Sequence, residues 1–419
     1  MRHLSALLLL LVIFSCKKDE ENTNSNPNSV NEEIYSLFND IYLWYDQLPQ
    51  LDPNVYSSPY ELVDALRYEQ FDRWSFLLPR EEFQQYFVSG ESVGHGFVLS
   101  RDESDNVRVA LIYPSTNAYA KGVRRGWILN QVNGTEVTPQ NVVGLLGSNE
   151  QGINNDIVFT NNEGNQVELN LVKQVVEINP VVYSEVLTVE NVKIGYFVFQ
   201  DFIGTAIPEM DSIFNVFKQE NINGLIIDLR YNGGGSVDVA LEMAGWLTGN
   251  EDAGKNLVNF RHNDKHKELD TSYSVPFNSQ ALDINQVVFI GTDRTASASE
   301  LMINGMDPFM EVELVGTPTE GKSVGMYSIL LETDDLVAFP VSFRYTNSEG
   351  DGDFYEGLQP DVLINDDVTH DFGDLNEDML NAAVDAVLGD VAVTKKSTYA
   401  EKNRLIEPNR RISDFMRAF

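Results

Sequence analysis

Cysteine, histidine and positive charge are all scarce in this sequence. The chain has one cysteine and five histidines among its 419 residues. A lone cysteine cannot form a disulfide within its own chain, so a fold held together by disulfides is excluded. Because the chain has so few histidines, a catalytic serine–histidine–aspartate triad is not favoured.

The histidines also give no sign of a metal site. His262 and His266 lie four positions apart, but neither helical periodicity nor a nearby third ligand accompanies them. Metal ions in protein sites take three or four such ligands, so a solvated loop is the better interpretation. We predict no metal and no cofactor for this protein.

Basic residues are too few to balance the acidic ones. The chain has 29 Lys and Arg against 64 Asp and Glu, a formal net charge of −35. Such a surface repels nucleic-acid phosphates and anionic lipid, so neither is expected as a partner through electrostatics. The hydrophobic content of 42% is nevertheless that of a folded globular protein. The length allows two or three domains with a substantial core.

Apolar runs long enough to span a bilayer comfortably are also absent. The run from Leu4 to Phe14 follows a short positive end, which predicts a signal peptide over residues 1–15. Cys16 follows an Ile-Phe-Ser sequence, and this junction resembles a bacterial lipobox. The resemblance implies cleavage before Cys16 and lipidation of its side chain. The alternative is a chance cysteine at the end of a signal peptide.

A lipidated Cys16 would anchor the protein in the cell envelope. We expect it to be lipid-anchored to the outer membrane, on the periplasmic side or at the cell surface, and to touch the membrane only through the lipid. Residues 16–29 are rich in Asn, Ser, Glu and Pro and have nothing to bury. This composition predicts a tether.

Helical spacing begins after the tether. Ser29-Val30-Asn31-Glu32 has the spacing of a capping box, and apolar residues then recur at helical intervals up to Pro49. A second helix start is predicted at Ser58-Pro59, where a cap residue precedes a proline. We therefore expect a small helical N-terminal domain over residues 30–91.

Short strands are predicted from Val93 onward. The run from Pro114 to Gly134, with its Lys-Gly-Val, Arg-Gly and Val-Asn-Gly segments, resembles a PDZ domain that covers residues 92–174. Trp127 stands where that family usually has Asp, and a generic small β-domain is the alternative. The resemblance implies a loop that binds a peptide's terminal carboxylate while the peptide adds to the sheet edge. The residues of this loop are Gly94, His95, Gly96 and Phe97.

Strands alternate with helices between residues 175 and 390. Buried strands are predicted at 194–199 and 225–229 with a helix between them, which indicates an α/β layer with mainly parallel pairing. Directly after the second strand, a run of three glycines ends at Gly235. These glycines give close backbone access and an anion-binding nest. A plain turn is the alternative.

The rest of the chain is organised around residues 286–326. An apolar run breaks at Gly291 and leads into Thr-Ala-Ser-Ala-Ser-Glu, which predicts a buried strand, a tight turn and a helix start. Small residues around Ser297 let backbone approach a substrate, and a helix beginning there directs unpaired N–H groups at developing charge. A second strand ends at Gly316, and the next loop carries Lys322. If the two strands are parallel, Ser297 and Lys322 reach one edge of a sheet.

The loop that carries Lys322 has a second interpretation. From Gly316 to Ser323 it fits the phosphate-binding pattern G-x-x-x-x-G-K-S. That pattern must open a helix whose N-terminus binds the phosphates, whereas the residues that follow have strand-like composition. Glu320 would also place a carboxylate beside the phosphates. A nucleotide-binding protein is therefore the least favoured alternative.

Taken together, these segments resemble the C-terminal processing peptidases, also called tail-specific proteases, over about residues 60–390. The resemblance implies an α/β (α+β multidomain) fold with a crotonase-like peptidase core over residues 175–390. It also implies an exported serine endopeptidase that recognises the C-terminal tails of protein substrates through the PDZ-like domain. Matching motifs make Ser297 the nucleophile and Lys322 its base. The implied oxyanion donors are the backbone N–H groups of Gly234, Gly235 and Ala298.

The chemistry of such a pair is coherent. A lysine can take the proton of a serine only when it is neutral, which requires burial to lower its pKa. Two departures stand out: Met326 replaces the Gln that often orients the amine, and Gly233 replaces a proline of the glycine loop. A catalytically silent relative that binds peptides or small apolar ligands in the same cleft is the main alternative.

The C-terminal tail, residues 391–419, is net positive, whereas the chain as a whole is net negative. It carries seven Lys or Arg against three acidic residues. We expect it either to dock on the acidic body or to stay loose.

Overall fold

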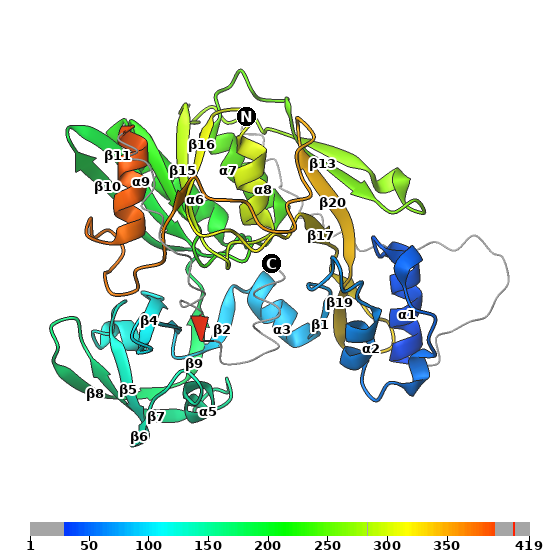
Figure 1. The fold of residues 1–419 in the computed structure, drawn as a ribbon, viewed down its shortest axis with the longest axis horizontal. Helices are drawn as coiled ribbons and strands as arrows, with labels where there is room; N and C mark the ends of the chain where they lie inside the picture. The colour runs from blue at the N-terminus through cyan, green and yellow to red at the C-terminus, as the bar shows by residue number, and fades with distance from the viewer. Residues whose placement is uncertain (1–28, 283, 390–404, 407–419) are drawn as a thin grey trace, which may run out of the picture.

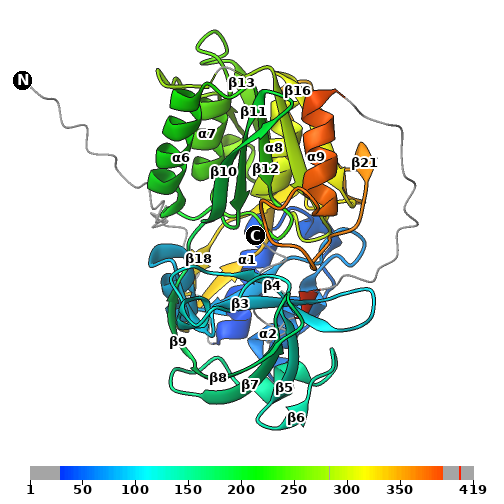
Figure 2. The same ribbon diagram turned by 90° about the vertical axis from the view of Figure 1, so that its left-hand side faces the viewer.

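The computed structural model describes residues 29–282, 284–389 and 405–406. One part of the molecule contains a six-stranded sheet in the order β10-β11-β12-β15-β16-β21 (Figures 1 and 2). All its pairs are parallel except β10 with β11, so the predicted parallel layer is confirmed. The strands are β10 (Val181–Val189), β11 (Val192–Phe199), β12 (Gly224–Asp228), β15 (Gln286–Gly291), β16 (Glu311–Gly316) and β21 (Val362–Leu363).

Helices cover both faces of this sheet (Figures 1 and 2). Successive side chains of a strand point to opposite faces, so Ile227 packs in one core and Ile226 in the other. The first core includes α6 (Ala206–Glu220), α7 (Val237–Leu247) and α8 (Ala298–Met306), and the second includes α9 (Asp378–Leu388). None of the helices in the described parts of the chain is long and apolar enough to cross a membrane.

A four-stranded sheet in the order β14-β13-β20-β17 begins where the lysine loop ends. β17 (Val324–Met326) starts directly after Ser323, so the loop opens a strand and not a helix. A phosphate-binding loop needs a helix N-terminus at this point, and the nucleotide-binding alternative is therefore excluded. The other elements here are β13 (Asn256–His262), β14 (Thr271–Ser274), β20 (Val341–Asn347) and the short helix η4 (Lys267–Leu269).

The two predicted N-terminal helices are present as α1 (Val30–Ile41) and α2 (Pro59–Leu66). Each is capped by the serine before it, Ser29 or Ser58, whose side chain accepts a backbone N–H of the first turn. Both predicted helix starts are confirmed.

The N-terminal segment is not the purely helical domain that the sequence predicts. β1 (Phe76–Pro79) pairs with β19 (Leu336–Phe339), and the two parts share one core in which the rings of Phe76 and Phe339 stack at 4.4 Å. The aromatic residues that the sequence assigns to a helical core therefore also pack against a strand from a distant part of the chain. The remaining elements are η1 (Tyr45–Gln47), η2 (Pro53–Val55), α3 (Arg80–Phe83), η3 (Gln84–Val88) and β18 (Ile329–Leu330).

A β-rich unit between residues 91 and 177 has a core of its own. Its main sheet has the order β22-β3-β4-β5-β7-β8, with β6 paired to β5, and a separate β2–β9 pair closes the unit at its ends. Its elements are β2 (Glu91–Gly94), β3 (Phe97–Arg101), β4 (Val107–Ile112), α4 (Asn117–Ala120), β5 (Ile128–Val132), β6 (Thr135–Glu136), α5 (Val142–Leu146), β7 (Asn154–Thr160), β8 (Gln166–Val172) and β9 (Gln174–Glu177). The strand β22 (Leu405–Ile406) comes from the far end of the chain.

Candidate active site

Ser297 stands at the turn between β15 and α8 in a strained backbone conformation. Its φ is 56° and its ψ is −114°, which lies outside the regions favoured by residues with a Cβ. Strain of this kind persists only where the surroundings enforce it, and it clusters at functional sites. The N–H of Ser297 donates to Glu300 Oε2 at 3.0 Å. Ser297 is half-buried and lines a pocket.

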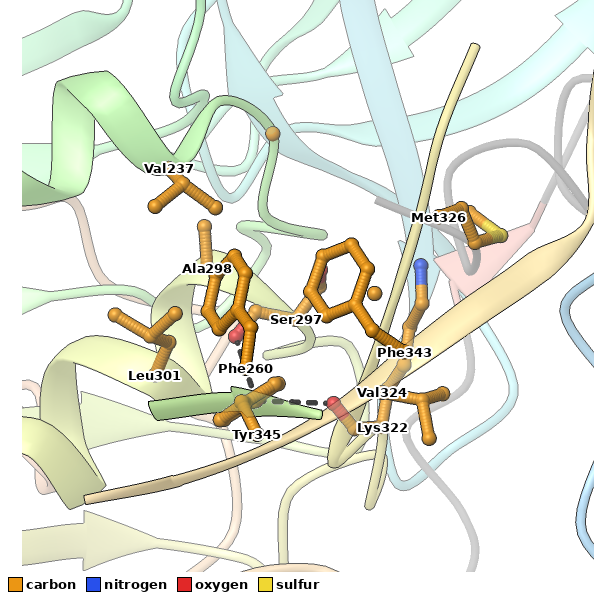
Figure 3. Close-up of a pocket in the computed structure, with 12 residues that line it drawn as sticks. Val237, Phe260, Ser297, Ala298, Leu301, Lys322, Val324, Met326, Phe343 and Tyr345 are labelled. Atoms are coloured by element: carbon orange, nitrogen blue, oxygen red, sulfur yellow. Dashed lines mark hydrogen bonds between the residues drawn. The ribbon is translucent and has the colours of Figure 1, made fainter. Parts of the chain in front are cut away.

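Lys322 reaches the same pocket from the loop that follows β16. β15 and β16 pair in parallel with Gly291 opposite Gly316, so the predicted delivery of Ser297 and Lys322 to one sheet edge is confirmed. A Cβ at position 316 would lie 1.9 Å from the carbonyl oxygen of Gly291, so only glycine fits there. Lys322 is 1% exposed. In Figure 3 its side chain extends toward Met326.

Burial changes the acid–base chemistry of Lys322. Desolvation lowers the pKa of its ammonium to about 7, although the carboxylates of Glu300 and Asp72 act in the opposite direction. About half of such lysines are neutral near pH 7. Only the neutral amine can accept a proton, so the buried position gives Lys322 the protonation state that a base needs.

Glu300 holds the serine turn and the lysine loop together. Its buried carboxylate accepts four hydrogen bonds, from the N–H groups of Ser297, Gly321 and Lys322 and the hydroxyl of Thr319. The Thr319 oxygen itself accepts the N–H of Leu358, which leaves its proton for Glu300. Burial raises the pKa of Glu300 to about 7, but all four of these partners are donors and favour the ionised carboxylate.

Tyr345 on β20 is a second link between the two loops. Its buried hydroxyl lies 3.1 Å from the carbonyl oxygen of Ser297 and 3.0 Å from that of Lys322. Sequence reasoning missed the roles of Glu300 and Tyr345. Glu300 stands in the Ser-Ala-Ser-Glu motif, which was a usable signal, whereas no local pattern marks Tyr345, which follows Ser297 by 48 residues and Lys322 by 23.

The glycine loop after β12 borders the pocket. Gly235 lines it with a φ of 134°, and a Cβ there would lie 2.5 Å from the carbonyl oxygen of Phe202. The N–H of Gly234 donates to Asn232 Oδ1 at 2.8 Å, so it is engaged within the loop. Ala298 is the first residue of α8, where backbone N–H groups lack intrahelical acceptors. Of the three predicted oxyanion donors, Gly235 and Ala298 line the pocket.

The residues just before β1 clamp the lysine loop. Arg73 Nε donates to Glu320 Oε1 at 2.9 Å, and its guanidinium also contacts the Glu320 carbonyl oxygen. The indole N–H of Trp74 donates to the same carboxylate oxygen at 3.2 Å. The N-terminal segment therefore fixes the residue two positions before Lys322.

The pocket between Ser297 and Lys322 has mainly apolar walls (Figure 3). The rings of Phe260 and Phe343 stack at 4.3 Å along one side, and Met326 lies at the lysine end. Met326 offers only a thioether, which is a weak hydrogen-bond acceptor. An apolar side chain fits these walls better than a charged one.

A buried charge network lies behind the glycine loop. Arg125 of the β-rich unit and Arg230, at the end of β12, each donate to Asp366 Oδ1 at 2.8 Å. Burial alone would raise the pKa of Asp366, but the two guanidiniums outweigh it and hold that pKa below its usual range. Arg230 also bonds the carboxylates of Asp228 and Glu377. The network joins the β-rich unit to the strand that leads into the glycine loop.

The predicted carboxylate loop lies in the β-rich unit, and none of its residues lines the pocket. His95 Nε2 lies 2.8 Å from Asn155 Oδ1, and its ring stacks on Phe97. Burial lowers the pKa of His95 to about 4, so the ring is neutral near pH 7. The predicted lipidation site, Cys16, lies outside the described residues.

Two family models match this chain. The model described as peptidase family S41 matches residues 193–364, and the model described as the peptidase S41 N-terminal domain matches residues 29–76. The first match contains Ser297, Lys322 and the glycine loop. The second contains the two residues that clamp the lysine loop.

Curated relatives point the same way. A "Probable CtpA-like serine protease" of Staphylococcus aureus (strain COL) is 22% identical over 344 residues, which are 81% of this chain and 65% of the relative. A Staphylococcus epidermidis protein of the same description is 24% identical over 307 residues, which are 72% of this chain and 60% of the relative. The chain therefore spans just under two thirds of the length of these relatives.

A solved structure shows the same fold. The crystal structure of a "Putative S41 protease" from Bacteroides fragilis matches with a TM-score of 0.72 and 23% sequence identity. The match covers 85% of this chain and 97% of that one. The two chains thus share the mixed α/β architecture described above.

Proposed function

Because this chain belongs to peptidase family S41, we propose that it is a serine endopeptidase that works through a dyad of Ser297 and Lys322. One observation carries the proposal: a strained, half-buried serine and a fully buried lysine line the same pocket. A serine hydroxyl becomes a strong nucleophile when an adjacent base takes its proton. A lysine whose pKa is about 7 can do so at neutral pH.

The reaction proceeds through an acyl-enzyme. Neutral Lys322 accepts the Ser297 proton as Oγ bonds to the scissile carbonyl carbon, and the N–H groups of Gly235 and Ala298 donate to the resulting oxyanion. Each such donor contributes about 3 kcal/mol in comparable sites. The lysine ammonium then gives its proton to the leaving amine as the C–N bond breaks. Lys322 next takes a proton from the water that attacks the acyl carbon, and it gives this proton to Ser297 Oγ as the ester bond breaks and the acid product leaves.

The apolar walls support a preference for substrates with an apolar side chain next to the scissile bond. Phe260, Leu301 and Phe343 leave no charged partner for an acidic or basic side chain on that side of the pocket. Burying a lone charge there would cost far more than a single hydrogen bond returns.

Covalent labelling tests the dyad directly. A serine-directed fluorophosphonate should modify Ser297, as mapped by mass spectrometry, and the Ser297→Ala variant should take up no label. Ser299→Ala is the matched control, because the Ser299 hydroxyl is buried and donates to the Asn232 carbonyl oxygen. Equal labelling of the native protein and Ser297→Ala would overturn the proposal.

If the protein is instead a catalytically inactive relative that binds peptides, a different result is expected. Such a protein would bind peptides in the same pocket without turning them over. Stoichiometric peptide binding by the native protein, with no label on Ser297 and no cleavage product, would favour this alternative over the peptidase.

We further propose that substrates are selected by their C-terminal tails at the β-rich unit. The support is the position of the Gly94 to Phe97 loop directly before β3, where a peptide could add to the sheet and place its carboxylate at backbone N–H groups. Cleavage of one unfolded substrate with a free or an amidated C-terminus tests this proposal. Equal cleavage of both forms would remove the role in tail recognition.

Cell-envelope anchoring through Cys16 is also a proposal, supported by the lipobox-like junction. The native protein should fractionate with membranes, and Cys16→Ala should move it to the soluble fraction. Unchanged fractionation would require another anchor. Protease treatment of intact cells then distinguishes the cell surface from the periplasmic side.

A further inference from the structure

The outer edge of the sheet in the β-rich unit is covered by the chain's own C-terminal region. β22 pairs antiparallel with β3, with Leu405 opposite Ser100 and Ile406 opposite Leu99. The short red arrow in Figure 1 marks β22 against this unit. β22 is the outermost strand of the sheet, so β3 would be the edge without it. Open edges of this kind readily accept a further strand.

The direction of β22 is the one expected of a bound substrate tail. The predicted carboxylate loop ends at Phe97, where β3 begins. In the antiparallel register Ile406 lies opposite Leu99 and is therefore nearer to that loop than Leu405. A tail that adds to β3 with its carboxylate toward the loop would run in the same direction along the same edge. The two segments therefore compete for the same positions.

Two buried polar atoms at this edge support the presence of a ligand site. Ser100 Oγ and His95 Nδ1 have no hydrogen-bond partner among the described residues. Ser100 is 1% exposed and His95 is 8% exposed. Buried polar side-chain atoms in folded proteins are normally paired, so two such atoms in one loop and strand indicate a place for a further polar group.

The sequence of the C-terminal region fits a segment of the chain that occupies the β3 edge only weakly. Residues 391–419 carry seven Lys or Arg against three acidic residues, in a chain whose net charge is −35. Opposite charges attract, which favours an internal segment of this composition on an acidic protein. Further residues follow Ile406, so the segment that pairs with β3 is internal. It uses the strand edge but offers no terminal carboxylate next to Ile406.

We propose that β22, formed by Leu405 and Ile406, is an intramolecular competitor that occupies the β3 edge until a substrate tail displaces it. The inference rests on the proposed tail recognition and adds its regulation. Two paired residues form a short ladder, which a tail with a free carboxylate can replace. A tethered segment acts at an effective concentration in the millimolar range, so it raises the concentration of substrate tail needed for binding without changing the chemistry at Ser297.

Three variants test the competition between β22 and a substrate tail for the β3 edge. All three carry Ser297→Ala so that peptides are not cleaved. Ile406→Pro removes a backbone N–H and fixes φ, which prevents regular strand pairing. Ala400→Pro is the matched control, since it places the same change upstream of the paired residues. A chain that ends at residue 390 removes the segment altogether. The probe is a fluorescent peptide with an apolar free C-terminus, with its amidated form as the specificity control, and binding is followed by anisotropy.

The expected result is peptide binding about three- to tenfold tighter for Ile406→Pro and for the shortened chain, with Ala400→Pro unchanged. In the active background the same variants should lower KM for a tailed substrate and leave kcat unchanged. Equal Kd values in all proteins, with the amidated peptide binding weakly, would overturn the competition and leave tail recognition standing. Absence of peptide binding in every protein would overturn tail recognition and the competition with it.

Discussion

Lys322 can act as a base only in the fraction of molecules in which its amine is neutral. Its pKa of about 7 in the folded protein means that protonation, and loss of the base, sets in as pH falls through that value. We expect kcat/KM to rise with pH through a single step near 7. Lys322→Arg, which stays protonated, should be inactive at every pH. A flat profile between about pH 6 and 9 would identify a different base.

The burial of Lys322 also makes the stability of the folded protein depend on pH. In the unfolded chain Lys322 has its ordinary pKa, so between about 7 and 10.5 the unfolded state binds a proton that the folded state does not. Stability contributed by this group therefore rises with pH across that window. Lys322→Met should raise the melting temperature at neutral pH while abolishing activity, a combination that a purely structural lysine would not give.

Glu300 should be irreplaceable even by its own amide. Each of its carboxylate oxygens accepts two donors, so either orientation of a glutamine would turn an NH2 group toward two donors. We expect Glu300→Gln to lose roughly 2–4 kcal/mol of unfolding free energy. With the serine turn and lysine loop released, kcat should fall by about two orders of magnitude.

Denaturant unfolding and steady-state kinetics of Glu300→Gln measure both effects. Glu311→Gln, on the exposed start of β16, is the control and should match the native protein. A Glu300→Gln protein of native stability and activity would mean that the two loops are held by other contacts, such as those of Tyr345.

At the scale of elements, the active site depends on strands and loops that are far apart in sequence. Parallel pairing of β15 and β16 could be predicted because each strand is a short apolar run that ends at a glycine, Gly291 or Gly316. The β1–β19 pair could not, since a short strand carries no mark of its partner when the partner lies more than two hundred residues away. The pairing of β22 with β3 was missed for the same reason, whereas the position of Tyr345 was missed because no local pattern marks it.

The N-terminal clamp on the lysine loop gives a prediction at this scale. Arg73 is half exposed, so its salt bridge with Glu320 contributes little to global stability. It does fix the loop two residues before Lys322, and small displacements of a base reduce rates steeply. We expect Arg73→Met to lower kcat about tenfold and leave the melting temperature nearly unchanged.

Arg80→Met is the matched control for Arg73→Met. Arg80 belongs to the same N-terminal region and is similarly exposed, but its ion pair is with Asp335 at 3.8 Å, on the turn before β19. The control should keep native kcat. If both variants lose the same activity, the effect comes from a general change in the N-terminal region and not from the clamp.

At the scale of the whole molecule, the β-rich unit and the six-stranded sheet meet through buried charges and through a shared apolar core that includes Leu111 and Val176. The sequence indicated two regions with different patterns of strands and helices, and the β-rich unit has one core of its own beside the shared one. The sequence did not indicate how they are joined, since Arg125, Arg230 and Asp366 come from three distant segments. A buried charge is tolerated only when all its partners are in place, and that arrangement is a property of the folded molecule.

Removing Arg125 should therefore weaken the whole assembly more than an ordinary arginine substitution. Arg125→Met would remove one of the two guanidiniums that donate to Asp366, and it would leave the Tyr231 hydroxyl and the Ala110 carbonyl oxygen without that donor. We expect a loss of about 3–5 kcal/mol in the free energy of unfolding, as for other broken buried pairs. Arg124→Met, one residue earlier, is the control, because the Arg124 guanidinium donates to the carbonyl oxygens of Tyr119 and Val123 in its own unit and lies over the Tyr119 ring. Equal unfolding free energies for the two variants would show that the buried network does not hold the β-rich unit to the sheet.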